Sequence, residues 1–250
     1  MLRSSQALAM VLLLGCGRVG YDPGSSDGGS ADLDAAAQVD ECAARHAGAR
    51  VCSGFEGDVG TYWSLTTRDG GTIATTTTVA HRGARALRAE VGGSGSTAFA
   101  HHRFVPIASG DLWLRAFVRV PAPSGSVGVN LLAVEHEGSD VFGIDVNVGV
   151  DGRLLVYGVE AGTFDAPDDV RLRADEWACV ELRIGVSDAD GELELFVDGA
   201  RAVSATGIDS YPEGDYDRLL VGVAWSDASQ APFEVLIDDV VLDVQPIGCD

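Results

Sequence analysis

The sequence contains no lysine. Its 17 basic residues are therefore all arginine, and against 38 acidic residues they leave a formal net charge of −21. The lack of lysine is consistent with GC-rich coding or with a preference for planar donors. A phosphate-binding surface needs a basic excess, so this balance excludes nucleic acid as a partner and argues against an anionic polymer unless the arginines cluster. It is typical of a solvated acidic surface that keeps an exported protein soluble.

The chain also lacks an apolar run of the ~20 residues that span a bilayer. A shorter apolar run, residues 7–14, follows Arg3 and ends at a Gly-Cys pair, which is the pattern of a secretory signal. The string LLGC resembles a bacterial lipobox, which implies a lipoprotein signal peptide at 1–15 and lipidation of Cys16. The alternative is an ordinary signal peptide with a chance cysteine. Because Gly17 stands where an aspartate would retain the protein at the inner membrane, we expect a lipid-anchored location in the cell envelope, at the outer membrane or cell surface.

Residues 16–40 have few large apolar side chains and are rich in Gly, Ser, Asp and Ala. Such a segment cannot bury enough apolar surface to offset its ordering entropy, so we expect a disordered tether. Its aspartates fit no EF-hand spacing and are interpreted as solvated linker charge. The folded domain is therefore expected at 41–250.

With Cys16 lipidated, four cysteines remain, an even number that predicts disulfides in an exported protein. Of the three possible connectivities, we favour Cys42–Cys52 as a local clasp and Cys179–Cys249 as a long-range link to the end of the chain. Zinc is the alternative, and it is weakened by the lack of a C-x-x-C pair and of a second histidine near His46.

Short alternating runs predict strands rather than helices. Residues 178–186 and 192–198 each alternate apolar and polar side chains, and tight Asp-Gly turns are predicted at 190–191, 198–199 and 151–152. The other predicted strands are 72–79, 85–91, 97–104, 112–120, 127–136, 141–150, 153–159, 218–225 and 233–243. So many short strands, with no useful amphipathic helix and no internal repeat, indicate an all-β fold: a two-sheet antiparallel β-sandwich of the jelly-roll kind.

Two strings within these strands carry a resemblance. EWACVELRI, in which a Trp opens a strand, and LELFVDG, which ends a hairpin, resemble the concanavalin A-like lectin/glucanase superfamily, including laminin-G-like jelly rolls. The resemblance covers roughly residues 51–250, and its motifs are generic to the fold. Members include lectins, carbohydrate-binding modules, glycosidases, polysaccharide lyases and adhesion domains. The resemblance therefore implies a fold more than an activity.

The strings GFEGD and LIDDVVL resemble the calcium-binding termini of many carbohydrate-binding jelly rolls. In those domains, the first and last strands lie side by side and bring carboxylates together around one cation. The resemblance implies Glu56, Asp58, Asp238 and Asp239 as ligands of a structural calcium ion, because calcium prefers several hard oxygens. The alternative is that these are polar residues alternating on edge strands.

Polar and aromatic residues alternate with core residues on several central strands, and together they predict a ligand-binding face. Aromatic rings stack on the apolar faces of sugars, and planar donors and acceptors recognise their hydroxyl groups. In the resembled superfamily, the concave sheet holds the ligand. The alternative is that the arginines and aspartates satisfy one another as cross-strand pairs. The predicted ligand-binding residues are His101, Arg103, Trp113, Arg115, Asp145, Asn147 and Tyr157.

These observations favour a non-catalytic domain that binds a carbohydrate or another cell-surface ligand. One alternative is a polysaccharide lyase acting on an anionic glycan, with a Tyr or His base beside an Arg or Asn; another is a structural envelope protein without a small ligand. The retaining-glycosidase arrangement of this fold, an E-x-D-x-E type strand, has no match. No catalytic residue is therefore assigned.

Overall fold

A computed structural model describes residues 41–93, 95–122, 128–138, 143–149, 151–212, 214–226 and 232–250. The predicted signal peptide, the lipidated Cys16 and the tether lie outside the described residues. Within the described part of the chain, no helix is long and apolar enough to cross a membrane. The two helices are short: α1 (Glu41–Arg45) and α2 (Val59–Tyr62).

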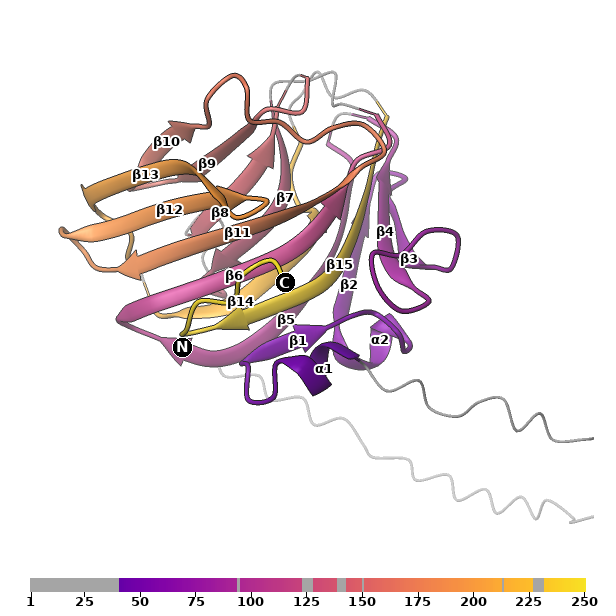
Figure 1. Ribbon diagram of the computed structural model, residues 1–250, viewed down its shortest axis with the longest axis horizontal. Helices are drawn as coiled ribbons and strands as arrows, with labels where there is room; N and C mark the ends of the chain where they lie inside the picture. The colour runs from indigo at the N-terminus through magenta and orange to yellow at the C-terminus, as the bar shows by residue number, and fades with distance from the viewer. Residues whose placement is uncertain are drawn as a thin grey trace, which may run out of the picture. The chain divides into compact units, whose positions relative to one another are not determined.

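The strands form two sheets that lie one over the other (Figure 1). Every pair of strands within them is antiparallel, so the predicted two-sheet antiparallel sandwich is confirmed. Sheet A has the order β13 (Ala200–Ile208), β12 (Gly191–Val197), β11 (Trp177–Val186), β6 (Gly110–Arg119), β15 (Phe233–Asp243), β4 (Ala86–Val91) and β3 (Thr72–Thr76), with β1 (Val51–Ser53) also paired to β15. Sheet B has the order β10 (Gly162–Asp165), β9 (Leu154–Gly158), β8 (Gly143–Val148), β7 (Val129–Glu135), β14 (Tyr216–Val223), β5 (Thr97–Ile107) and β2 (Ser64–Arg68).

The core lies between the inner faces of the two sheets, as the alternation predicts. On β6 the inward residues Leu112, Leu114 and Val118 are buried, and on β8 Ile144 and Val146 face them from sheet B. Removing these apolar side chains from water supplies the main driving force for stacking the sheets. The polar residues between them are thereby placed on the outer faces.

Two of the three predicted Asp-Gly turns are confirmed. Asp151 and Gly152, which precede β9, and Asp198 and Gly199, which join β12 to β13, all have positive φ, between 50° and 78°. This is the conformation that a tight hairpin turn requires. At 190–191 the structure differs, because Gly191 already belongs to β12. Ser187 instead holds a longer loop by accepting hydrogen bonds from the backbone N–H groups of residues 189 and 190.

Both described ends of the chain pack on the outer face of sheet A. The pairing of β1 with β15 places the first strand beside the last, and the Cys42–Cys52 disulfide ties α1 to β1. The Cys179–Cys249 disulfide ties the C-terminal segment to β11. Both predicted disulfides are confirmed. The short strands β1, β2 and β10 were not predicted, because they have too few alternating apolar residues to give a pattern.

Candidate functional site

The structure divides the predicted ligand-binding face between the two sheets. Trp113 and Arg115 lie on β6 of sheet A, whereas Asp145, Asn147, Tyr157, His101 and Arg103 lie on strands of sheet B. The prediction of one shared face is therefore wrong for the two β6 residues. The prediction failed because the two-residue alternation of side chains shows which residues share a face of one strand, but does not show to which sheet that strand belongs.

The five sheet B residues lie on the outer face of that sheet. The strand register aligns Tyr157, Asp145, Ala133, Leu220 and His101 in one row across β9, β8, β7, β14 and β5. Directly opposed residues of neighbouring strands point to the same side of a sheet. The row therefore has an aromatic ring and a carboxylate toward one end, a small apolar floor in the middle and a histidine at the other end.

A cleft of about 670 Å³ lies over this face. Two aromatic side chains in its lining are open to solvent: Tyr157 is 39% exposed and Trp225 is 55% exposed. Exposed apolar side chains gathered in one cleft are typical of a ligand-binding groove. The cleft is lined by Phe99, Gly128, Asn130, Ala133, Glu135, Gly143, Asp145, Asn147, Leu155, Tyr157, Thr163, Arg218, Leu220, Ala224 and Trp225.

The floor of the cleft carries buried polar groups. Asn130 and Asn147 face each other across β7 and β8 and are 3% and 6% exposed. The backbone N–H of Asn130 donates to the carbonyl of Trp225, which fixes the strand beside the exposed ring. Among the described residues, Asn130 Oδ1 and Arg218 Nε have no hydrogen-bond partner. Buried polar atoms normally have one, so these two atoms of the cleft residues are unsatisfied within the described chain.

The charges of the cleft are carried by two carboxylates and one guanidinium. Arg218 on β14 forms an ion pair with Glu135 on β7, its direct neighbour in the register. Asp145 forms no ion pair among the described residues and accepts a hydrogen bond from Asn130. The pKa of Asp145 is raised to about 7: burial is the largest cause, the charge of Glu135 adds to it, and the Asn130 hydrogen bond opposes the shift.

His101 and Arg103 lie at the β5 end of the same face. The ring of His101 is 6.0 Å from that of Phe99, which lines the cleft. Burial lowers the pKa of His101, and the charges of Arg218 and Arg103 lower it further, so its imidazole is held neutral near pH 7. Arg103 itself pairs with Glu137. The two residues therefore share the outer face of sheet B but lie outside the lining of the cleft.

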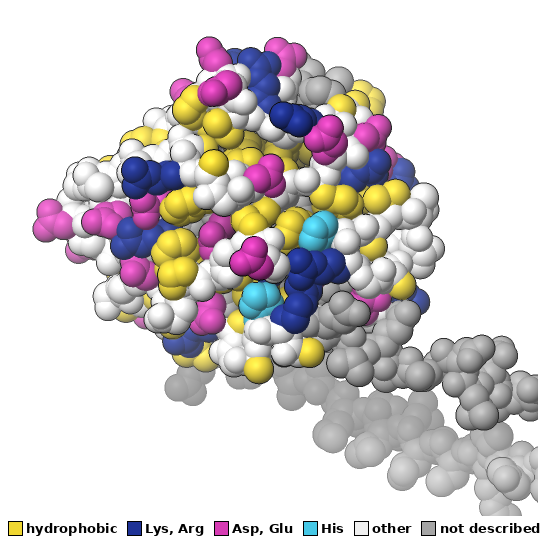
Figure 2. All heavy atoms as spheres, in the orientation of Figure 1, with side chains coloured by type: hydrophobic (Ala, Val, Ile, Leu, Met, Phe, Trp, Pro, Cys, Tyr) yellow, Lys and Arg dark blue, Asp and Glu magenta, His cyan; other side chains and the backbone are white. Residues whose placement is uncertain are grey.

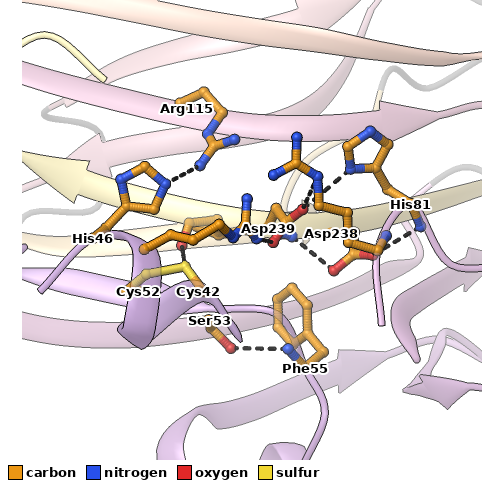
Figure 3. The surroundings of a disulfide bond; sticks show 12 residues. Cys42, His46, Cys52, Ser53, Phe55, His81, Arg115, Asp238 and Asp239 are labelled. Carbon is orange, nitrogen blue, oxygen red and sulfur yellow. Dashed lines mark hydrogen bonds and ion pairs between the residues drawn. A yellow bond between two sulfur atoms is a disulfide. The ribbon is translucent and has the colours of Figure 1, made fainter. Parts of the chain in front are cut away.

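The outer face of sheet A is built differently, because α1 covers it. Arg115 is fully buried, and its Nη2 lies 3.0 Å from His46 Nε2 (Figure 3). Its guanidinium carbon lies 5.1 Å from the centroid of the Phe117 ring. Burial lowers the pKa of Arg115 to about 10, although Asp239 opposes this shift. Arg115 is thus a buried charge under the N-terminal segment, and Trp113 beside it stacks on Phe196 at 6.2 Å.

Asp238 and Asp239 lie at a bulge in β15, the strand between β6 and β4. The interpretation of these residues as polar groups on an edge strand is therefore wrong. Asp239 has a φ of 48°, and its two oxygens take a hydrogen bond from Arg45 at 2.5 Å and one from His81 at 3.1 Å. Asp238 Oδ2 accepts the backbone N–H groups of His81 and Arg82.

The other two predicted calcium ligands also have partners within the chain. Glu56 Oε1 accepts the backbone N–H groups of Ala84 and Arg85, so Glu56 and Asp238 together hold the loop that precedes β4. Asp58 caps α2 through the N–H of Gly60. Within the described ranges, no three His, Cys, Asp or Glu side chains converge as a metal would require. The described geometry gives the calcium ion no ligand cluster, and its presence stays a prediction.

Comparison with known proteins identifies the family of this chain. The model of the family described as polysaccharide-lyase-like, Cip1-like core domain, matches residues 54–233, and the chain belongs to that family. Among solved structures, it is similar to the cellulose-induced protein Cip1, with a TM-score of 0.61, 20% identity, and coverage of 76% of this chain and 94% of that one. No curated protein matches.

Two lyases have the same fold. An endo-β-1,4-glucuronan lyase from the fungus Trichoderma reesei superposes with a TM-score of 0.55 at 15% identity, covering 73% of this chain and 91% of that one. The alginate lyase vAL-1 from a Chlorella virus gives 0.56 at 14% identity, covering 74% and 94%. At these identities the likeness shows the jelly-roll fold, and the family places the domain among carbohydrate-related β-sandwiches.

Several cleft residues were not predicted from sequence. Trp225, Asn130, Glu135 and Arg218 line the cleft, yet none was selected. Asn130 carried a usable signal, since it is a polar residue in the otherwise apolar run VNLLAV. The pairing of Glu135 with Arg218 carried none, because it depends on the register between β7 and β14, which lie far apart in the sequence.

Proposed function

We propose that the cleft on the outer face of sheet B binds a segment of a polysaccharide chain. The observation that carries the proposal is the combination, in one open cleft, of two exposed aromatic rings with a polar floor. Tyr157 and Trp225 present the rings, and Asn130 and Arg218 present buried polar atoms without partners in the described chain. The volume, about 670 Å³, falls within the range of ~300–1,000 Å³ typical of ligand sites.

Sugar rings fit such a surface for two reasons. Their C–H faces pack on aromatic rings, and their hydroxyl groups act as both donors and acceptors. Asn130 Oδ1 can accept a hydroxyl proton, and Arg218 Nε can donate to a hydroxyl oxygen. Leaving such buried atoms unpaired costs about 1–3 kcal/mol each, so their pairing on binding contributes to affinity. The membership in a polysaccharide-lyase-like family supports the same class of ligand.

The test removes the rings one at a time. Tyr157→Ala and Trp225→Ala are each expected to weaken binding of a recognised oligosaccharide about five- to tenfold in calorimetric titration, since a lost stacking contact is worth roughly 1–1.5 kcal/mol. Trp113→Ala is the matched control, because it removes an aromatic ring from the outer face of the other sheet. Equal loss in all three variants, or no loss in the cleft variants, would contradict the proposal.

Lyase activity is a second candidate, favoured by the direct opposition of Tyr157 and Asp145 in the register. In β-elimination on a uronate, the base takes the C5 proton, a C4=C5 double bond forms, the C4–O4 bond breaks, and O4 takes up a proton. Tyr157 is positioned to exchange protons, and Asn147 with the protonated form of Asp145 can hydrogen-bond the substrate carboxylate. The glucuronan and alginate lyases named above act on such polymers.

An ultraviolet assay separates the two candidates. Incubation with glucuronan and alginate at pH 6 and 8 would raise the absorbance of the unsaturated product if the cleft is catalytic, and Tyr157→Phe would abolish that rise while retaining binding. Binding without any increase in absorbance leaves the non-catalytic function in place.

The sequence motifs also support a cellular location for this function. We propose that lipidation at Cys16 holds the domain at the outer membrane or cell surface, where polysaccharides are accessible. Metabolic labelling with a fatty acid should mark the wild-type chain and leave Cys16→Ser unlabelled. A label on both chains would refute the anchor.

A further inference from the structure

The charged and hydrogen-bonding groups of the cleft are not balanced, and this imbalance limits the class of sugar that the cleft can bind. Its one described cation, the guanidinium of Arg218, is already paired with Glu135. Asp145 remains, with a hydrogen bond from Asn130 and no cationic partner in the described chain. The floor therefore offers a carboxylate whose charge is not balanced by the protein.

The acceptors around Asp145 face the same space. Asn130, 3% exposed, has its Oδ1 without a partner, and both residues line the cleft. Tyr157 lies directly opposite Asp145 on the next strand and presents an exposed ring. A carboxylate, an amide oxygen and an aromatic face form the surroundings that an ammonium group prefers: it has three N–H donors, a positive charge and affinity for a π face.

We propose that the Asp145 subsite binds the ammonium group of an amino sugar, so that the cleft prefers a polymer containing 2-amino-2-deoxyhexose units over neutral or uronic acid polymers. This inference rests on the proposed function. A uronate in the same position would bring a second negative charge beside Asp145 while the one described cation of the cleft is already paired with Glu135, so like-charge repulsion disfavours it. A neutral sugar would bind, but would leave Asp145 without a counter-charge in a partly buried site.

The experiment compares three β-1,4-linked tetraoses that share a backbone. Cellotetraose is neutral, its glucosamine analogue differs at C2 by an ammonium group, and its glucuronate analogue differs at C6 by a carboxylate. Calorimetric titration at pH 7 and 0.15 M salt should give about tenfold tighter binding of the glucosamine tetraose than of cellotetraose. The reason is that the ammonium group adds a charge-assisted hydrogen bond to Asp145. The glucuronate tetraose should bind weakest.

Variants separate the subsite from the overall negative charge of the protein. Asp145→Asn keeps the shape of the side chain and should reduce the preference for the glucosamine tetraose over cellotetraose to about twofold or less. Asp145→Ser serves the same purpose if the amide fails to give a cooperative thermal transition. The matched control is Asp190→Asn, which removes one negative charge from an exposed loop between β11 and β12 of sheet A.

The outcomes are distinguishable. If cellotetraose or the glucuronate tetraose binds as tightly as the glucosamine tetraose, the amino-sugar inference is overturned and polysaccharide binding stands. An equal effect of Asp190→Asn and Asp145→Asn also overturns it, because bulk charge would then account for the preference. If no oligosaccharide of any charge binds the folded protein, the proposed function is overturned and the inference with it.

Discussion

The outer faces of the two sheets carry the same alternating sequence pattern, but one face is covered by the chain and the other is open to solvent. On sheet A, Arg115 is fully buried under the N-terminal segment, whereas on sheet B Tyr157 and Trp225 stay open to solvent. On the face seen in Figure 2, acidic and basic side chains are interspersed over the surface. The difference teaches that a polar strand face becomes a binding surface or a second interior according to whether the chain ends return to cover it.

The pKa values of one buried carboxylate on each face show the same contrast. Burial alone raises the pKa of Asp239, but the hydrogen bond from His81 and the charge and hydrogen bond of Arg45 outweigh it, and the pKa is lowered overall. In the cleft, no cation performs this task for Asp145, so burial raises its pKa to about 7. Sheet A therefore supplies Asp239 with cationic partners, whereas among the described residues Asp145 on sheet B has none.

The largest expected effect comes from removing the link that holds the C-terminal segment on sheet A. The Cys179→Ala/Cys249→Ala variant should lose about 4 kcal/mol of unfolding free energy, because this disulfide closes a loop with a sequence separation of 70 residues. Removing Cys42–Cys52, with a separation of 10, should cost about 3 kcal/mol. Urea denaturation under non-reducing conditions measures both. A larger loss from the shorter loop would contradict this ordering.

Next in size is the removal of the counter-charge on the covered face. Asp239→Asn should lower the unfolding free energy by about 3 kcal/mol, because it removes the ion-pair partner of partly buried Arg45 and the negative charge nearest to buried Arg115. Oligosaccharide binding in the sheet B cleft should stay unchanged, which calorimetry checks. A loss of binding as large as the loss of stability would show that the two faces are coupled.

The two faces should respond to pH with opposite sign. The raised pKa of Asp145 contributes stability that is present below pH 4 and lost as pH rises through about 7, so Asp145→Asn should gain stability relative to wild type between pH 5 and 8, by about 1 kcal/mol or more. The lowered pKa of Asp239 contributes stability that is present above pH 4 and lost as pH falls below it. Thermal denaturation of both variants across this pH range tests the signs. The same direction of change for both would refute the comparison.

The smallest effect is expected from an ion pair that lies on neither the covered face nor the cleft. Arg153 and Asp168 are 3.2 Å apart, with side chains 51% and 84% exposed. Asp168→Asn should change the unfolding free energy by less than about 0.5 kcal/mol, because water and salt screen exposed pairs. The same urea titration provides the measurement, and a loss near that of Asp239→Asn would remove the distinction drawn between buried and exposed charges.

Much of the architecture was determined by the sequence itself. Alternation in runs such as 112–120 assigned inward and outward residues correctly, because the period of a strand is a local property of the backbone. The turns at 151–152 and 198–199 were also local, since Asp and Gly tolerate positive φ. The even number of cysteines and their positions led to the pairing that the structure contains.

Only the tertiary structure decided which of these faces belong together. Arg115 and Tyr157 read alike in sequence, as polar or aromatic residues between core positions, yet one is buried under α1 and the other opens into a cleft. Likewise, Asp145 acquires its raised pKa from burial and from the charge of Glu135, which reaches it through the register of β7 with β8. Side-chain period is set along a single strand, whereas strand order, register and the return of the chain ends are set by contacts between residues far apart in sequence.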